Sequence, residues 1–130
     1  MTPTKSYRSP LGRARGLGSA KQGVHHFWMQ RLSAIALVPL TLWFVFSVAQ
    51  LPGASYSAAR HWVSAPSVAV FLLLLIAALC YHSMLGIQVV IEDYVGREGR
   101  KLVLLLLSKF IHILAAVSGI FAVLSLALGK

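Results

Sequence analysis

Long uninterrupted apolar runs dominate the pattern of hydrophobic and polar positions along this chain. Two stretches, residues 32–59 and 61–91, contain no Asp, Glu, Lys or Arg, and a third, residues 102–129, contains only Lys109. A helix rises about 1.5 Å per residue, so about 20 apolar residues cross the ~30 Å hydrocarbon core of a bilayer. The pattern therefore predicts three transmembrane helices. They are expected at about residues 30–51, 66–91 and 102–128.

Composition favours a membrane protein over a soluble domain. Hydrophobic residues make up 58% of the chain and charged residues 12%, whereas a soluble domain has about 25% charged residues. The single cysteine, Cys80, excludes an internal disulfide and a cysteine zinc site. The first apolar run is about twice as long as the core of a signal peptide, so we expect it to be retained. The expected fold is all-α and integral to the membrane, with residues 23–130 as a three-helix membrane anchor domain.

The few charged residues are placed unevenly along the chain. Twelve Lys and Arg against three Asp and Glu give a formal net charge of +9, which in a soluble protein would suggest nucleic-acid binding. Here, however, half of the basic residues precede the first apolar run, and all three acidic residues share the second connection. The positive-inside rule then places the N-terminus in the cytoplasm and the C-terminus outside. Residues 1–22 are predicted to be a flexible basic tail that contacts anionic lipid or docks a cytoplasmic partner.

His82 is the main polar residue at membrane depth. It lies nine to ten residues before the end of the second span, hence about 14 Å below the surface. Gly86 and Asp93 fall on the same helical face, and Gly86 leaves room for a flat group beside the imidazole. A neutral imidazole in a helix core is a good axial ligand for haem iron. A histidine that only hydrogen-bonds a neighbouring helix explains the residue equally well.

Other polar residues near the span ends allow two interpretations each. His112 lies at a depth comparable to that of His82, and its neighbour Lys109 favours a polar contact between helices. The mouth of the first span carries His25, His26, Gln30 and Arg31. They are either interfacial side chains or a group in which Arg31 and one of the histidines hold the carboxylates of a cofactor. Tyr94 with Asp93 closes the second span, either as an interfacial anchor or as a donor to a quinone carbonyl with a nearby proton carrier.

Two stretches resemble one known family, the small hydrophobic anchor subunit of succinate:quinone oxidoreductase, respiratory complex II. They are GVHHFWMQRLSAIALVPL (Gly23–Leu40) and HSMLGIQVVIEDYV (His82–Val95). The resemblance covers about four fifths of the chain, with both stretches in order within a frame of three spans. It implies that the three helices are part of a multi-subunit helical bundle in a bacterial inner membrane. The chain would have no activity alone, because FAD and the iron–sulfur clusters belong to partner subunits.

The resemblance also implies roles for individual residues. His82 would be one axial ligand of haem b, with the other ligand supplied by the larger cytochrome b anchor subunit. Tyr94 would hydrogen-bond the ubiquinone head, supported by Asp93, while His25 and Arg31 would approach the haem propionates. The flavoprotein and iron–sulfur subunits are the expected soluble partners, and no nucleic acid is expected.

One departure and two alternatives accompany this resemblance. Many relatives carry a histidine two positions after the tyrosine, where this chain has Gly96. Any role of that histidine in proton supply or pocket shape is therefore absent or moved. A haem-free or fumarate-reductase-type anchor would share the same frame, and a structural subunit of another membrane complex would share the apolar pattern alone.

Overall fold

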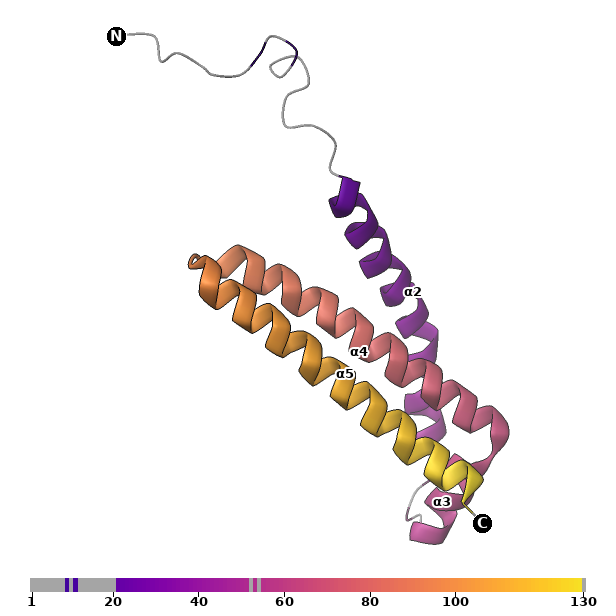
Figure 1. Ribbon diagram of the computed structural model, residues 1–130. Helices are drawn as coiled ribbons and strands as arrows, with labels where there is room; N and C mark the ends of the chain where they lie inside the picture. The colour runs from indigo at the N-terminus through magenta and orange to yellow at the C-terminus, as the bar shows by residue number, and fades with distance from the viewer. Residues whose placement is uncertain (1–8, 10, 12–20, 52, 54, 130) are drawn as a thin grey trace.

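The computed structural model describes residues 9, 11, 21–51, 53 and 55–129. From residue 21 onward they form the helices α2 (Lys21–Ala49), α3 (Tyr56–Ser64), α4 (Pro66–Tyr94) and α5 (Glu98–Leu128) (Figure 1). No strand occurs among the described residues. Helices α2, α4 and α5 are each long and apolar enough to cross a membrane. The predicted all-α fold with three membrane-spanning helices is confirmed.

The helices extend beyond the predicted spans at the ends that carry polar residues. Helix α2 begins at Lys21 rather than near residue 30, while α4 continues to Tyr94 and α5 already begins at Glu98. Hydropathy locates only the apolar part of a helix, because backbone hydrogen bonds continue unchanged into the polar interface. The last two residues of the predicted flexible tail, residues 1–22, are already helical. Apart from Ser9 and Leu11, the rest of that tail lies outside the described residues.

The first connection contains a short helix, α3, that the apolar pattern did not predict. The Ser55 side chain caps it by accepting a hydrogen bond from the backbone N–H of Ala58. Trp62 turns inward and stacks on Trp43 of α2, with ring centroids 6.2 Å apart. On the outer side, Arg60 Nη2 donates to the carbonyl oxygen of Gly129 at 3.2 Å, which joins α3 to the end of α5.

Helix α4 is the central element of the molecule. It runs along α5 and is crossed at an angle by α2 (Figure 1). A small core of Ala69, Leu72 and Val123 lies near the α3 end of this arrangement. In the most apolar stretch of α4, 17% of the residues are buried, against 6% in the corresponding stretches of α2 and α5. Most residues of these stretches are therefore available to lipid or to other helices.

Helices α4 and α5 pack closely at Gly119. A Cβ atom at this position would stand 3.2 Å from Ile76 Cγ2 and 3.3 Å from its Cδ1. Small residues at such positions let membrane helices pack closely, because no hydrophobic effect drives their association in lipid. The absent side chain of Gly119 therefore sets the distance between these two helices.

Candidate functional site

The crossing of α2 over α4 brings His82 into contact with Ser33. The distance between His82 Nδ1 and Ser33 Oγ is 3.0 Å, across 49 positions of sequence. Ser33 is 8% exposed and is the one buried polar residue in the described part of the chain. Its hydroxyl also lies 2.8 Å from the carbonyl oxygen of Met29, one turn earlier in α2. The imidazole in α4 is thus held by a group fixed on another helix.

The other ring nitrogen of His82 faces the side-chain amide of Gln30. His82 Nε2 and Gln30 Nε2 are 3.5 Å apart, which is a long contact for a hydrogen bond. The same amide nitrogen is the sole atom that a Cβ at Gly86 would meet within 4 Å, at 3.7 Å. The Gln30 amide nitrogen therefore lies within contact distance of both His82 Nε2 and Gly86.

Three residues of α2 form a polar stripe toward α4: His26, Gln30 and Ser33. Their spacing of four and three places them on one face of the helix. Within the described residues, His26 Nε2 and Gln30 Oε1 are buried without a hydrogen-bond partner. Such groups are rare in folded proteins and call for an ordered water, an ion or a ligand. The polar stripe therefore has unused hydrogen-bonding capacity beside His82.

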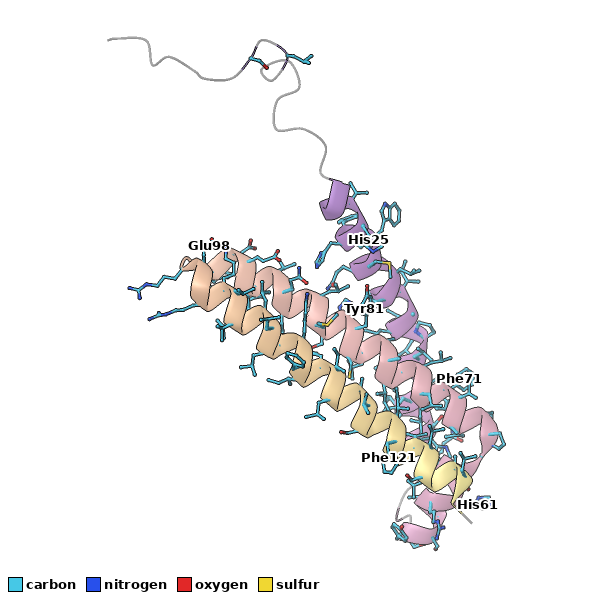
Figure 2. All side chains as sticks on the ribbon, viewed as in Figure 1. His25, His61, Phe71, Tyr81, Glu98 and Phe121 are labelled. Carbon is cyan, nitrogen blue, oxygen red and sulfur yellow. The ribbon has the colours of Figure 1, made fainter. Side chains whose placement is uncertain are left out.

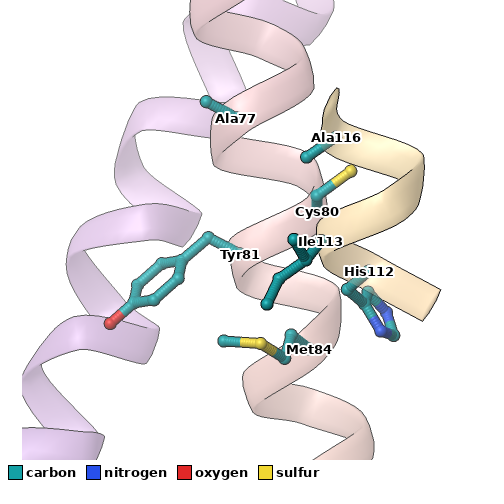
Figure 3. Close-up of a pocket in the computed structure, with 7 residues that line it drawn as sticks. All are labelled: Ala77, Cys80, Tyr81, Met84, His112, Ile113 and Ala116. Atoms are coloured by element: carbon teal, nitrogen blue, oxygen red, sulfur yellow. The ribbon is translucent and has the colours of Figure 1, made fainter. Parts of the chain in front are cut away.

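His112 is engaged differently, because both of its ring nitrogens have partners within the chain. Its Nδ1 donates to the carbonyl oxygen of Ser108 at 2.7 Å, so Nε2 accepts from the Ser83 hydroxyl at 3.1 Å. The predicted polar contact between helices is confirmed, and it joins α5 to α4. Next to it lies an apolar cavity of about 210 Å³ (Figure 3). Its lining is Ala77, Cys80, Tyr81, Met84, His112, Ile113 and Ala116.

The turn between α4 and α5 carries the second candidate group. Tyr94 ends α4 and is 85% exposed, at the rim of a hollow of about 340 Å³ that also borders Gly96, Arg97 and Arg100. A Cβ at Gly96 would meet nothing within 4 Å, so this hollow is open. Asp93 is exposed as well. The turn thus presents a phenol and two guanidinium groups around one hollow, with the carboxylate of Asp93 next to Tyr94 in the sequence.

Comparison with known proteins identifies the family. A family model described as "Succinate dehydrogenase/Fumarate reductase transmembrane subunit" matches residues 5–121. The chain belongs to this family. The anchor is 34% identical to the succinate dehydrogenase hydrophobic membrane anchor subunit of Rickettsia bellii over 120 residues. These residues make up 92% of this chain and 96% of the relative.

Two further relatives carry closely similar names. The anchor is 34% identical to the succinate dehydrogenase hydrophobic membrane anchor subunit of Paracoccus denitrificans, over 73% of this chain and 74% of the relative. It is 32% identical to the succinate dehydrogenase membrane anchor subunit of Reclinomonas americana, over 72% of this chain and 80% of the relative. The family predicted from the two sequence stretches is therefore confirmed, and with it a multi-pass membrane protein.

The two other predicted residues of the anchor, His25 and Arg31, lie on exposed positions of α2 (Figure 2 labels His25). The guanidinium of Arg31 stands 5.2 Å from the centre of the Phe27 ring. Arg31 precedes Ser33 by two residues, which places it about 200° around the helix from the side that contacts α4. No hydrogen bond in the described part of the chain joins His25 or Arg31 to His82. Their role toward a cofactor stays a prediction.

Sequence reasoning missed Ser33, and it treated Gln30 and His26 only as part of a polar group at the mouth of the first span. A signal for all three was present, because their spacing marks one face of an otherwise apolar span. The family resemblance instead selected Arg31 and the neighbouring His25. Among the described residues, no three His, Cys, Asp or Glu gather in one place.

Proposed function

We propose that this anchor subunit attaches succinate dehydrogenase to the membrane, supplies His82 as an axial ligand of haem b, and supplies Tyr94 to the ubiquinone site. The observation that carries the proposal is the geometry of His82. Its imidazole is fixed through Nδ1 by Ser33, while Nε2 meets the flexible side chain of Gln30 in a long contact of 3.5 Å, next to Gly86. A ligand histidine needs this arrangement, with one nitrogen oriented by a hydrogen bond and the other available to the metal.

The residues around His82 fit a haem. Gly86 leaves room for a flat macrocycle, provided that the Gln30 side chain turns aside. The buried atoms His26 Nε2 and Gln30 Oε1, which have no partner in the described chain, provide polar groups for the edge of such a cofactor. Bound there, a haem supplies one-electron transfer at the membrane. The larger cytochrome b anchor subunit would provide the second axial ligand.

At the α4–α5 turn, Tyr94 and Asp93 would serve ubiquinone. Tyr94 lies twelve residues after His82, about 18 Å along the helix, which places it at the membrane surface. Its hydroxyl donates to a quinone carbonyl oxygen, and this bond strengthens as the oxygen gains negative charge on reduction. Asp93, exposed beside it, carries a proton toward the same oxygen. The hollow lined by Tyr94, Gly96 and Arg97 gives a quinone head access from the turn.

The chain performs this role only within a complex. Large apolar side chains stay exposed along α2 and α5, and they need lipid or the helices of the larger anchor subunit. The flavoprotein and iron–sulfur subunits would oxidise succinate and deliver electrons at the α4–α5 turn. The excess of basic residues before α2 favours a bacterial inner membrane orientation with the N-terminus and this turn in the cytoplasm and the C-terminus outside.

The test is the reduced-minus-oxidised spectrum of the purified complex carrying His82→Ala. We expect the haem b signal to be lost or strongly reduced, since the substitution removes the proposed ligand while Ser33 and Gln30 remain in place. His112→Ala is the matched control, because it removes a histidine at similar depth whose nitrogens are already used. A complex that lacks haem before any substitution would be a haem-free anchor. Loss of the signal in His112→Ala alone would move the ligand to α5.

A further inference from the structure

We propose that Ser33 is the positioning residue for His82, and that its hydroxyl determines which ring nitrogen is free for the metal. The inference rests on the proposed role of His82 as a haem ligand. It starts from the 3.0 Å contact between Ser33 Oγ and His82 Nδ1, which links α2 to α4 at the level of the candidate site. Ser33 lies on the polar stripe of α2 and is 8% exposed, so water competes little for its hydroxyl.

The hydrogen on the Ser33 hydroxyl has a definite direction. Ser33 Oγ lies 2.8 Å from the carbonyl oxygen of Met29 and 3.0 Å from that of Gln30. Two oxygen atoms 2.8 Å apart repel each other unless a hydrogen lies between them, and a carbonyl oxygen has no hydrogen to supply, so this geometry favours a hydroxyl hydrogen directed at one of the two carbonyl oxygens. The lone pairs of Oγ then face α4. In this arrangement Ser33 accepts a hydrogen bond from Nδ1–H of His82.

This arrangement selects one tautomer of His82. With the proton on Nδ1, the lone pair lies on Nε2, the nitrogen that faces Gln30 and the space at Gly86. A hydrogen bond from Nδ1–H to an acceptor also raises the basicity of a ligating imidazole and fixes the plane of its ring. Ser33 therefore prepares His82 for coordination before any metal is present, and it increases electron donation from Nε2 afterwards.

The contact is more than helix packing. Serine side chains inside helices commonly bond their own preceding carbonyl, and Ser33 would be satisfied by Met29 alone. The second bond, to His82, is what joins the two helices at this level. Ser83 on α4 provides an internal comparison, because its hydroxyl also joins two helices through a histidine, donating to His112 Nε2 at 3.1 Å away from the polar stripe. Loss of the Ser83 hydroxyl should weaken the packing of α4 against α5 without altering His82.

The experiment measures the midpoint potential and the ferric electron paramagnetic resonance signal of haem b in the complete complex. Ser33→Ala removes the acceptor, and the weaker imidazole then stabilises the ferric state less. We expect the reduction equilibrium to shift about threefold to tenfold toward the ferrous form, as for one ordinary hydrogen bond. For one electron this is an upward shift of about 30–60 mV. The ferric signal should broaden, since the ring plane is no longer fixed.

Two further variants of the same residue make the result decisive. Ser33→Thr keeps the hydroxyl and should retain the potential of the unmodified complex. Ser33→Cys replaces it with a weak acceptor of the same shape and should shift the potential as Ser33→Ala does, which provides the measurement if the alanine variant does not assemble. Ser83→Ala should leave both the potential and the signal unchanged.

The outcomes separate this inference from the function on which it rests. If His82→Ala retains the haem, the proposed ligand is wrong. If His82→Ala loses the haem while Ser33→Ala and Ser33→Cys keep both the potential and the signal, His82 is the ligand and Ser33 does not position it. An equal shift in Ser83→Ala would attribute the effect to general loosening of α4 and would also overturn the role of Ser33.

Discussion

Substitution of Tyr94 by Phe should slow quinone reduction while leaving the fold intact. The side chain is 85% exposed, and its hydroxyl makes no hydrogen bond within the described residues, so its removal breaks no internal contact. The ring is retained, and the change deletes one donor to an oxygen that becomes charged during the reaction. Such a bond contributes about 1.5–3 kcal/mol. A change of about 1.4 kcal/mol in the activation free energy corresponds to a tenfold change in rate. We therefore expect the rate of quinone reduction to decrease roughly 10- to 100-fold.

The assay compares two electron acceptors in the purified complex. Reduction of a short-chain ubiquinone by succinate should fall, whereas reduction of a water-soluble dye that takes electrons before the membrane should stay unchanged. Haem content should also be unaffected. Tyr81→Phe is the matched control, because it deletes the same hydroxyl thirteen residues earlier on α4. If quinone reduction persists in both Tyr94→Phe and Asp93→Asn, the pocket is formed by the partner subunits and the reasoning is refuted.

Three further predictions concern topology and packing. Reporter fusions should place residues 20 and 98 in the cytoplasm and the C-terminus outside; a cytoplasmic C-terminus would contradict three spans in this orientation. Gly119→Leu should lower the melting temperature of the complex, because overpacking against Ile76 costs about 1–3 kcal/mol. Adding Ile76→Ala should partly restore the melting temperature. If it does not, the close contact at Gly119 does not determine the packing of α4 against α5. Trp62→Ala should increase proteolysis between α2 and α4, because the stacking on α2 is lost, and an unchanged cleavage rate would argue against that role.

Hydropathy predicted the three spans because the bilayer sets the required length of each apolar run. It did not predict α3, whose nine residues are polar enough to resemble a loop. The position of α3 depends on Trp43 and Trp62, which are nineteen residues apart and meet only after the chain has turned. Helix ends were misplaced by several residues for a related reason, since a helix does not stop where its apolar part stops.

The candidate site was predictable only in part. His82 was identifiable alone, because an ionisable side chain deep in an apolar run is costly and therefore informative. Its orientation depends on Ser33, and no local pattern near His82 indicates which residue of another helix lies opposite. The angle at which α2 crosses α4 decides this, and that angle follows from packing along both helices. The same crossing explains why His26, rather than its neighbour His25, has a buried nitrogen.

The central place of α4 has a consequence for biogenesis. A ribosome releases α2 first, then α3 and α4, and α5 last. The contact between Ser33 and His82 involves only α2 and α4, so it requires the insertion of these two helices and not that of α5. Capture of the proposed cofactor therefore does not have to wait until α5 has entered the bilayer. A chain truncated after α4 would still contain the imidazole together with the hydroxyl that orients it.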